Sequence, residues 1–275
     1  MEKYLPRIIG SFVNFLSYFS SKYAAKLAVK VFSTPRKGRL DKEAFDYLQS
    51  ASIQDLNHDD FSFRTYHWKG SKATVLLVHG WESNAFRWKD LIELLKKEGY
   101  AIIAVDAPAH GASGSKTFNA ILYSECIHMV MEAFDIDYVV GHSVGGNSVA
   151  LALQSYKKQS IKKFVIMGSP SNFAGLVQHY VDLMGYNGKV ISGMHDYFLE
   201  HFGHTVDHYK ASNFLGKIEA EGLIIHDKMD DVIPFKNALE NYRAYPNAKL
   251  IKTESLGHRL RSYKVYGYIL DFLND

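Results

Sequence analysis

The chain has 275 residues, of which 47% are apolar and 22% charged, the balance of a globular protein with one large core. Its 32 basic and 29 acidic residues give a formal net charge of +3 without long runs of like charge, so we expect no nucleic-acid partner. Cys126 is the only cysteine, which excludes an intramolecular disulfide and favours a reducing compartment, the cytoplasm.

The first thirty residues carry an apolar stripe at three- and four-residue steps, which is typical of an amphipathic helix. The stripe consists of Leu5, Ile8, Phe12, Phe15, Phe19, Tyr23 and Leu27. We expect this face to pack on the main domain of the chain, predicted below at residues 61–275, or on a partner. The alternatives are peripheral contact of this helix with a membrane, which would make the protein membrane-associated, and a secretory signal, which the interspersed polar residues disfavour. Residues 1–60 are therefore predicted to form an N-terminal helical extension.

Short apolar runs, rich in β-branched residues, follow from residue 61 onward and indicate strands. An outer strand is predicted at 61–68, and buried strands at 74–79, 101–106, 138–141, 163–168, 223–226 and 249–253. Helical segments are predicted at 85–98, 117–134, 145–158, 235–245 and 263–273. This alternation predicts an α/β fold, a doubly wound and mostly parallel sheet, for a catalytic domain that covers residues 61–275.

Residues 170–216 interrupt the alternation with aromatic-rich helical segments. An insertion after the carboxyl end of a strand lies over the crevice where open α/β sheets bind ligands, so we expect a small helical cap whose aromatic residues, including Phe173, shape the substrate pocket. Within it, four side chains have the spacing of metal ligands on a helix: His201, His204, Asp207 and His208. Because Gly203 argues against a stiff helix there, we expect no metal site.

The segment Gly141-His142-Ser143-Val144-Gly145 follows a predicted strand and opens a helix of small residues. In that context a GxSxG pattern indicates a nucleophile elbow, a tight turn that exposes the serine hydroxyl. Glycines at 141 and 145 leave out side chains that would collide with neighbouring backbone. The amides at the helix N-terminus favour the oxyanion that forms when a serine attacks a carbonyl group.

From about residue 61 to its end the chain resembles the α/β-hydrolase superfamily, with motifs in the order that this superfamily requires. The motifs are His79-Gly80-Trp81, Asp106-Ala107-Pro108-Ala109-His110-Gly111, the elbow at Ser143, Asp230-Asp231-Val232-Ile233-Pro234 and Gly257-His258. The resemblance implies Ser143 as nucleophile, His258 as base, and an oxyanion hole formed by the backbone amides of Trp81 and Val144. The side chains of Trp81 and His142 are expected to line the substrate pocket.

Three aspartates compete for the acid that orients the base, because Asp227, Asp230 and Asp231 all follow the predicted strand at 223–226. The usual acid of the superfamily lies four residues before the proline of a D-x-x-V/I-P loop. Here that proline is Pro234, which favours Asp230, with Asp227 as the main rival.

The resemblance implies a serine hydrolase that cleaves a small carboxylic ester through an acyl-enzyme and needs no cofactor. The same residues could serve thioester, amide or carbon–carbon bond hydrolysis, or acyl transfer to an acceptor other than water. A non-catalytic binding protein on a hydrolase scaffold is the remaining alternative, since the fold alone does not select a function.

Overall fold

A computed structural model describes residues 4–156 and 161–275, which form two compact units. One unit comprises Met1–Thr34 and Asn172–Lys210, and the other comprises Pro35–Ser171 and Ala211–Asp275. The boundary that the sequence placed at residue 60 therefore moves to residue 34, because residues 35–60 pack with the sheet. The predicted insertion at 170–216 shortens to 172–210, because residues 170–171 and 211–216 belong to the larger unit.

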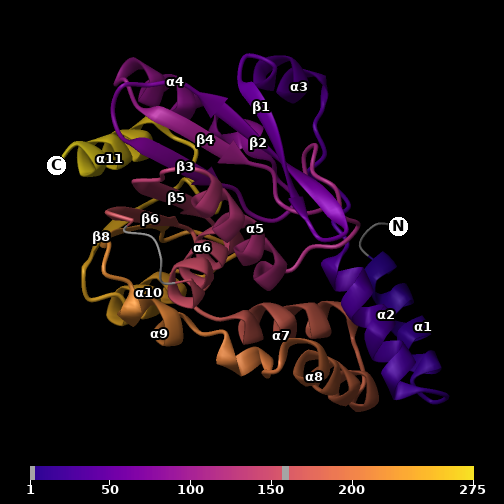
Figure 1. Cartoon of the computed structure of the whole chain (residues 1–275). Coiled ribbons are helices and arrows are strands. Elements are labelled where there is room, and N and C mark those ends of the chain that lie inside the picture. Colours follow the sequence, from indigo (N-terminus) through magenta and orange to yellow (C-terminus); the bar gives the residue numbers. More distant parts are fainter. Residues whose placement is uncertain (1–3, 157–160) are drawn as a thin grey trace. The chain divides into compact units, whose positions relative to one another are not determined.

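The larger unit is built on a sheet of eight strands in the order β1-β2-β4-β3-β5-β6-β7-β8 (Figure 1). Its strands are β1 (Ser52–His58), β2 (Phe61–Trp68), β3 (Thr74–Val78), β4 (Ala101–Val105), β5 (Tyr138–His142), β6 (Lys163–Met167), β7 (Glu221–Asp227) and β8 (Ala248–Thr253). From β4 to β8 all neighbours are parallel, whereas β2 runs antiparallel to β4 and to β1. The predicted doubly wound, mostly parallel α/β sheet is confirmed.

Strand β1 is the one strand of this sheet that the sequence did not predict. It is an edge strand whose side chains are mostly exposed, so it lacks the apolar run of a buried strand. Its register with β2 places Asp55 opposite Arg64, and their side chains form a bidentate ion pair at 2.8 Å. The antiparallel backbone pairing with β2 over seven residues, more than burial, holds β1 to the sheet, and this ion pair adds to it.

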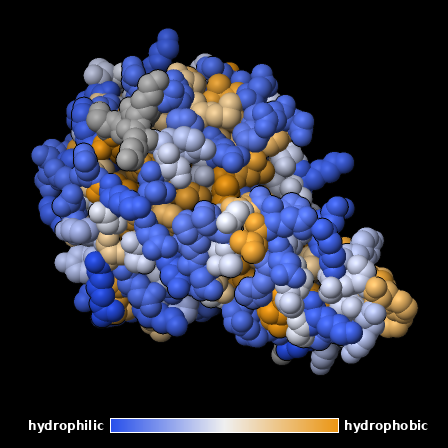
Figure 2. Space-filling view, turned by 60° about the horizontal axis from the view of Figure 1, so that its bottom comes forward, coloured by the Kyte–Doolittle hydropathy of each residue, from blue (hydrophilic) through white to orange (hydrophobic). Residues whose placement is uncertain are grey.

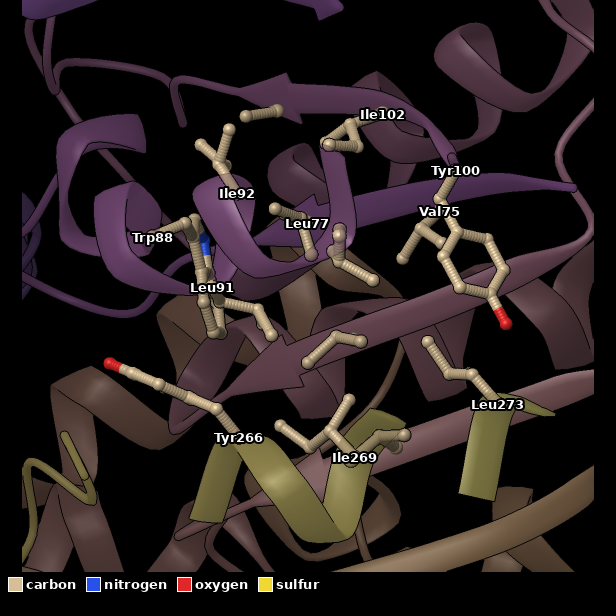
Figure 3. Close-up of a cluster of buried hydrophobic side chains, with 14 of the residues drawn as sticks. Val75, Leu77, Trp88, Leu91, Ile92, Tyr100, Ile102, Tyr266, Ile269 and Leu273 are labelled. Carbon is tan, nitrogen blue, oxygen red and sulfur yellow. The ribbon is translucent and has the colours of Figure 1, made fainter. Parts of the chain in front are cut away.

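Helices cover both faces of this sheet (Figure 1). They are α3 (Lys42–Leu48), η2 (Ala85–Trp88), α4 (Lys89–Lys97), α5 (Ala120–Ala133), α6 (Val144–Ser155), α9 (Ala211–Phe214), η4 (Leu215–Lys217), α10 (Lys236–Ala244) and α11 (Tyr263–Asn274). Figure 3 shows the core between the sheet and the helices α4 and α11, where Leu91 and Ile269 point toward Leu77 of β3. Residues 157 and 158, predicted to end the helix after the elbow, lie outside the described residues.

The smaller unit consists of helices from two distant parts of the sequence. They are α1 (Leu5–Leu16), α2 (Ser21–Ser33), α7 (Phe173–Met184), α8 (Gly188–Phe202) and η3 (Val206–His208). The single long helix expected at the N-terminus is divided, because the Ser20 side chain accepts a hydrogen bond from the Tyr23 amide and caps a new helix. None of the helices among the described residues has the length and apolar character needed to cross a membrane.

Most of the apolar stripe of the N-terminal segment is not covered by the chain, and only Leu27 of its seven residues is partly buried. Leu5, Ile8, Phe12, Phe15, Phe19 and Tyr23 are all exposed. The buried positions of α1 are instead Gly10 and Val13, which face α7 and α8 together with the partly buried Ile9 and Leu16. The sequence did not show which side of α1 the chain covers, because α1 is apolar on two sides and periodicity alone does not tell them apart. Packing of the exposed side on a partner stays a prediction.

Candidate active site

Ser143 lies at the turn between β5 and α6, with backbone dihedrals φ 54° and ψ −131°. Positive φ is rare for a residue with a side chain, so this is a strained position that the surrounding structure must hold. The Ser169 hydroxyl donates a hydrogen bond of 2.7 Å to the Ser143 carbonyl oxygen. A Cβ atom on Gly145 would lie 2.3 Å from the carbonyl oxygen of His79, and one on Gly141 would lie 2.6 Å from Gly146 Cα. Both glycines are therefore required by close backbone approaches.

Three of the predicted residues meet at the carboxyl edge of the sheet. His258 Nε2 lies 3.1 Å from the Ser143 hydroxyl oxygen, and His258 Nδ1 lies 2.8 Å from Asp230 Oδ2. Asp230 follows β7 and His258 follows β8, so neighbouring parallel strands bring both residues to the elbow after β5. This arrangement lets the imidazole accept the serine proton while the carboxylate fixes its tautomer.

The Asp230 carboxylate is held in its ionised form. Burial opposes ionisation, but hydrogen bonds from histidine and backbone donors outweigh it, and the pKa of Asp230 lies well below its ordinary value. The donors include His258 and the amides of Val232 and Ile233, at 2.9 and 2.8 Å. His226 Nε2 lies 3.4 Å away on the buried side. The carboxylate can thus stabilise a positive charge on His258.

Asp227, the rival candidate for the acid, has a different set of contacts. Its carboxylate accepts hydrogen bonds from the Thr253 hydroxyl at 2.8 Å and from the amides of Leu256 and Met229, at 3.0 and 2.9 Å. Burial opposes its ionisation as well, but these donors lower the pKa of Asp227. Because its partners lie in both loops that carry Asp230 and His258, Asp227 ties the two loops together.

The predicted oxyanion donors follow Gly80 and Ser143, two residues whose backbones lie close together. A Cβ atom on Gly80 would be 2.8 Å from Ser143 Cβ, so the turn after β3 passes directly against the nucleophile. Within the described part of the chain, neither the Trp81 amide nor the Val144 amide donates a hydrogen bond to another residue. Val144 is the first residue of α6, where amides lack partners in the helix. An oxyanion hole formed by these two amides stays a prediction.

Two pocket predictions concern side chains in the same unit. Trp81 is 38% exposed, and its ring meets those of His110 and Phe118, with centroids 5.4 Å apart in both pairs. His142 is 7% exposed, and its Nε2–H donates to the His258 carbonyl oxygen at 2.9 Å. Through this bond His142 supports the loop that carries His258.

The third predicted pocket residue, Phe173, is the first residue of α7 in the smaller unit. Its ring contacts that of Tyr209 in an edge-on arrangement. A role of Phe173 in the pocket stays a prediction. In the same unit, the rings of His204 and His208 stack on each other at 3.8 Å, and His201 Nδ1 lies 3.0 Å from the Tyr197 carbonyl oxygen.

Sequence reasoning missed a buried arginine that supports the same loop. Arg87 is 6% exposed, its guanidinium lies over the Trp88 ring, and its Nη2 donates to the Arg259 carbonyl oxygen at 2.9 Å. Burial lowers the pKa of Arg87 to about 9. No motif signals this contact, because it joins η2 to a loop 172 residues away.

Buried neutral histidines beneath the site make the fold sensitive to acid. Burial lowers the pKa of His79 from 6.5 to about 3, and that of His110 to about 4. His79 Nδ1–H donates to the Gly80 carbonyl oxygen, and Nε2 accepts from the Ala107 amide, a pattern that only the neutral ring supports. The unfolded chain takes up a proton on each ring below pH 6.5, so stability falls as the pH drops from 6.5 toward these values.

We expect His79 alone to remove about 2 kcal/mol of unfolding free energy at pH 5 relative to pH 7.5. Urea unfolding at both pH values would measure this loss in the wild type and in His79→Gln. The variant is expected to be less stable at pH 7.5 but to lose about 2 kcal/mol less on acidification. Equal losses in the two proteins would contradict a buried neutral His79.

Comparison with known proteins finds a matching family model and several similar proteins. The model of the alpha/beta hydrolase fold matches residues 73–184. A 2-hydroxy-6-oxononadienedioate/2-hydroxy-6-oxononatrienedioate hydrolase of Pseudomonas putida is 24% identical over 200 residues, which cover 69% of this chain and 67% of that protein. A pimeloyl-(acyl-carrier protein) methyl ester esterase of Vibrio atlanticus is 26% identical over 155 residues, 56% of this chain and 58% of that protein.

Among solved structures, mouse alpha/beta hydrolase domain-containing protein 10 superposes with a TM-score of 0.66 at 16% identity, over 82% of this chain and 98% of that one. At that identity the likeness concerns the fold. Together with the matched segment and the curated relatives, it leads to one conclusion: the chain is a hydrolase with the α/β-hydrolase fold.

Proposed function

We propose that this chain is a serine hydrolase that cleaves carboxylic esters through an acyl-enzyme, with Ser143 as nucleophile, His258 as base and Asp230 as the orienting acid. The observation that carries the proposal is the continuous path from Ser143 Oγ through the His258 ring to Asp230, with distances of 3.1 and 2.8 Å. Each contact lies within the reach that proton transfer requires.

In the proposed reaction, Ser143 Oγ attacks the ester carbonyl carbon as His258 Nε2 takes the hydroxyl proton. The oxyanion that forms accepts hydrogen bonds from the amides of Trp81 and Val144, and each such donor contributes about 3 kcal/mol of transition-state stabilisation. The C–O bond to the alcohol then breaks, and His258 returns the proton to the leaving oxygen. A water molecule, deprotonated by His258, releases the acid and restores the serine.

An ester substrate is supported by the Vibrio relative, which is named as a methyl ester esterase. The Pseudomonas relative supports a second candidate, hydrolysis of an oxo-dienedioate like the one in that protein's name, and its match covers more of this chain. Product analysis with both compound classes separates them, because an esterase releases an alcohol. We further propose a cytoplasmic location, which the single and buried Cys126 supports.

The decisive experiment is covalent labelling of the full chain with a fluorophosphonate, followed by intact mass measurement and peptide mapping. We expect one adduct per chain, located on Ser143, and parallel loss of p-nitrophenyl acetate and butyrate turnover. Ser155→Ala, which removes an exposed hydroxyl at the end of α6, should label like the wild type. A folded protein with neither adduct nor turnover would instead support a binding protein on a hydrolase scaffold.

A further inference from the structure

Helix α1 presents two apolar faces, and only one of them is covered by the chain. On the covered side, Gly10 approaches so closely that a Cβ atom there would lie 1.8 Å from the Met184 carbonyl oxygen. Asn14 donates to the Gly185 carbonyl oxygen and accepts from the Asn187 amide, both at 2.8 Å. These contacts fix which side of α1 faces α7 and α8.

The opposite side of α1 is a row of large apolar side chains without cover. Ile8 is 64% exposed, Phe12 56% and Phe15 59%, and the row continues past the helix end with Phe19 at 77%. We call these four residues the aromatic row. A helix that is apolar on both sides is normally buried on both. In Figure 2, orange and tan atoms break the blue surface at the right edge, the side on which α1 lies in Figure 1.

The charged side chains of α1 and α2 are all of one sign. Residues 4–34 contain four basic residues and no acidic residue. They are Arg7, Lys22, Lys26 and Lys30. The three lysines are exposed at four-residue steps of α2, so they form one line along that helix. Lys22 pairs with Glu200, whereas Lys26 and Lys30 have no acidic partner within the described ranges.

Three exposed tyrosines lie in the same segment of the chain as the aromatic row. Tyr4, Tyr18 and Tyr23 are 69%, 70% and 61% exposed, and Lys189 Nζ lies 4.5 Å from the centre of the Tyr18 ring. Tyrosine is enriched where hydrocarbon meets water, because its ring is apolar and its hydroxyl group is polar.

From this combination we propose that the aromatic row of α1 inserts into the surface of an anionic lipid bilayer, to which the basic residues of α1 and α2 attract it. Helix α1 has 12 residues and is about 18 Å long, too short for a hydrocarbon core of about 30 Å, so it lies along the surface. A helix with aromatic residues on one side and neighbouring lysines has the composition of an interfacial anchor.

The charges argue against the two protein alternatives. A second copy on the same row would bring equal sets of lysines together around a two-fold axis, and like charges repel. A protein partner would have to pair this hydrocarbon row with an apolar groove of matching shape. Fluid lipid requires no such pairing.

The test is co-sedimentation of the full chain with vesicles of phosphatidylcholine alone or mixed with phosphatidylglycerol. We expect binding to the mixed vesicles that weakens in high salt, and weak binding to the neutral ones. Phe12→Ser with Phe15→Ser should lower the partition coefficient about tenfold or more. Lys26→Gln with Lys30→Gln should lower it by on the order of fivefold for each lysine, with the mixed vesicles only.

Leu199→Ser is the matched control, since it removes a 54% exposed apolar side chain from α8 in the same unit and should leave binding unchanged. Circular dichroism melting would show that all variants fold. Absent binding of the wild type, or equal binding of Phe12→Ser with Phe15→Ser, would overturn the proposal. So would a dimer that this double variant abolishes without any vesicle binding. Ser143→Ala should bind like the wild type, which separates this test from the proposed hydrolase activity.

Discussion

Replacing Ser143 with alanine is expected to lower kcat for p-nitrophenyl butyrate by on the order of 10⁴- to 10⁶-fold, with little change in KM. The alanine lacks the oxygen that His258 Nε2 reaches at 3.1 Å, so no acyl-enzyme can form. Steady-state kinetics at saturating substrate would measure the loss. The substitution also leaves the strained backbone at φ 54° in place, so we expect the fold to persist.

Ser155→Ala is the matched control for this loss, because its hydroxyl is exposed at the far end of α6. Its kcat should equal that of the wild type. If Ser143→Ala retained turnover within tenfold of the wild type, a nucleophile other than Ser143 would have to be sought.

Replacing Asp230 with asparagine is expected to lower kcat by on the order of 10⁴-fold. Asparagine cannot both accept the His258 Nδ1–H bond and carry the negative charge that stabilises the imidazolium. The comparison variant is Asp227→Asn, which leaves the contact between Asp230 and His258 in place. It disturbs the bonds to Thr253 and Leu256, so we expect it to cost about 1–3 kcal/mol of unfolding free energy.

Kinetics and urea unfolding of both aspartate variants separate the two roles. Asp230→Asn should affect mainly kcat, and Asp227→Asn mainly stability. The opposite pattern, with the larger loss of kcat in Asp227→Asn, would assign the acid to Asp227 and remove Asp230 from the proposed mechanism.

Buried strands were the easiest part of this fold to predict. The strands of a parallel sheet are covered on both faces, so each appears in the sequence as a continuous run of apolar, often β-branched residues. Strand β1 escaped prediction since Gln54, Asp55 and Asn57 give it the composition of a loop. Its strand state depends on β2, whose partner positions are 67 to 61 in antiparallel order. Pairing with a neighbour is not encoded in the composition of a short segment, so edge strands are poorly predicted.

Motif spacing selected Ser143, Asp230 and His258, which the fold brings within hydrogen-bond distance. The supporting residues left no such signal. His226 and Arg87 act through backbone atoms of other loops, at the carbonyl groups of Ile233 and Arg259. A carbonyl group is present in every residue, so a contact with one leaves no pattern of residue types in the sequence. These contacts are therefore seen only in the folded chain.

The smaller unit has a consequence for how the protein is made. Helices α1 and α2 leave the ribosome before the helices that cover them, α7 and α8, which end only at Phe202. At 5–20 residues per second, the early pair waits for roughly ten to thirty seconds before its partners exist. During that interval Val13, Ala24 and Ala28, buried in the finished protein, have no native contacts across the unit. A chaperone or a nearby bilayer could therefore contact these two helices before α7 and α8 do.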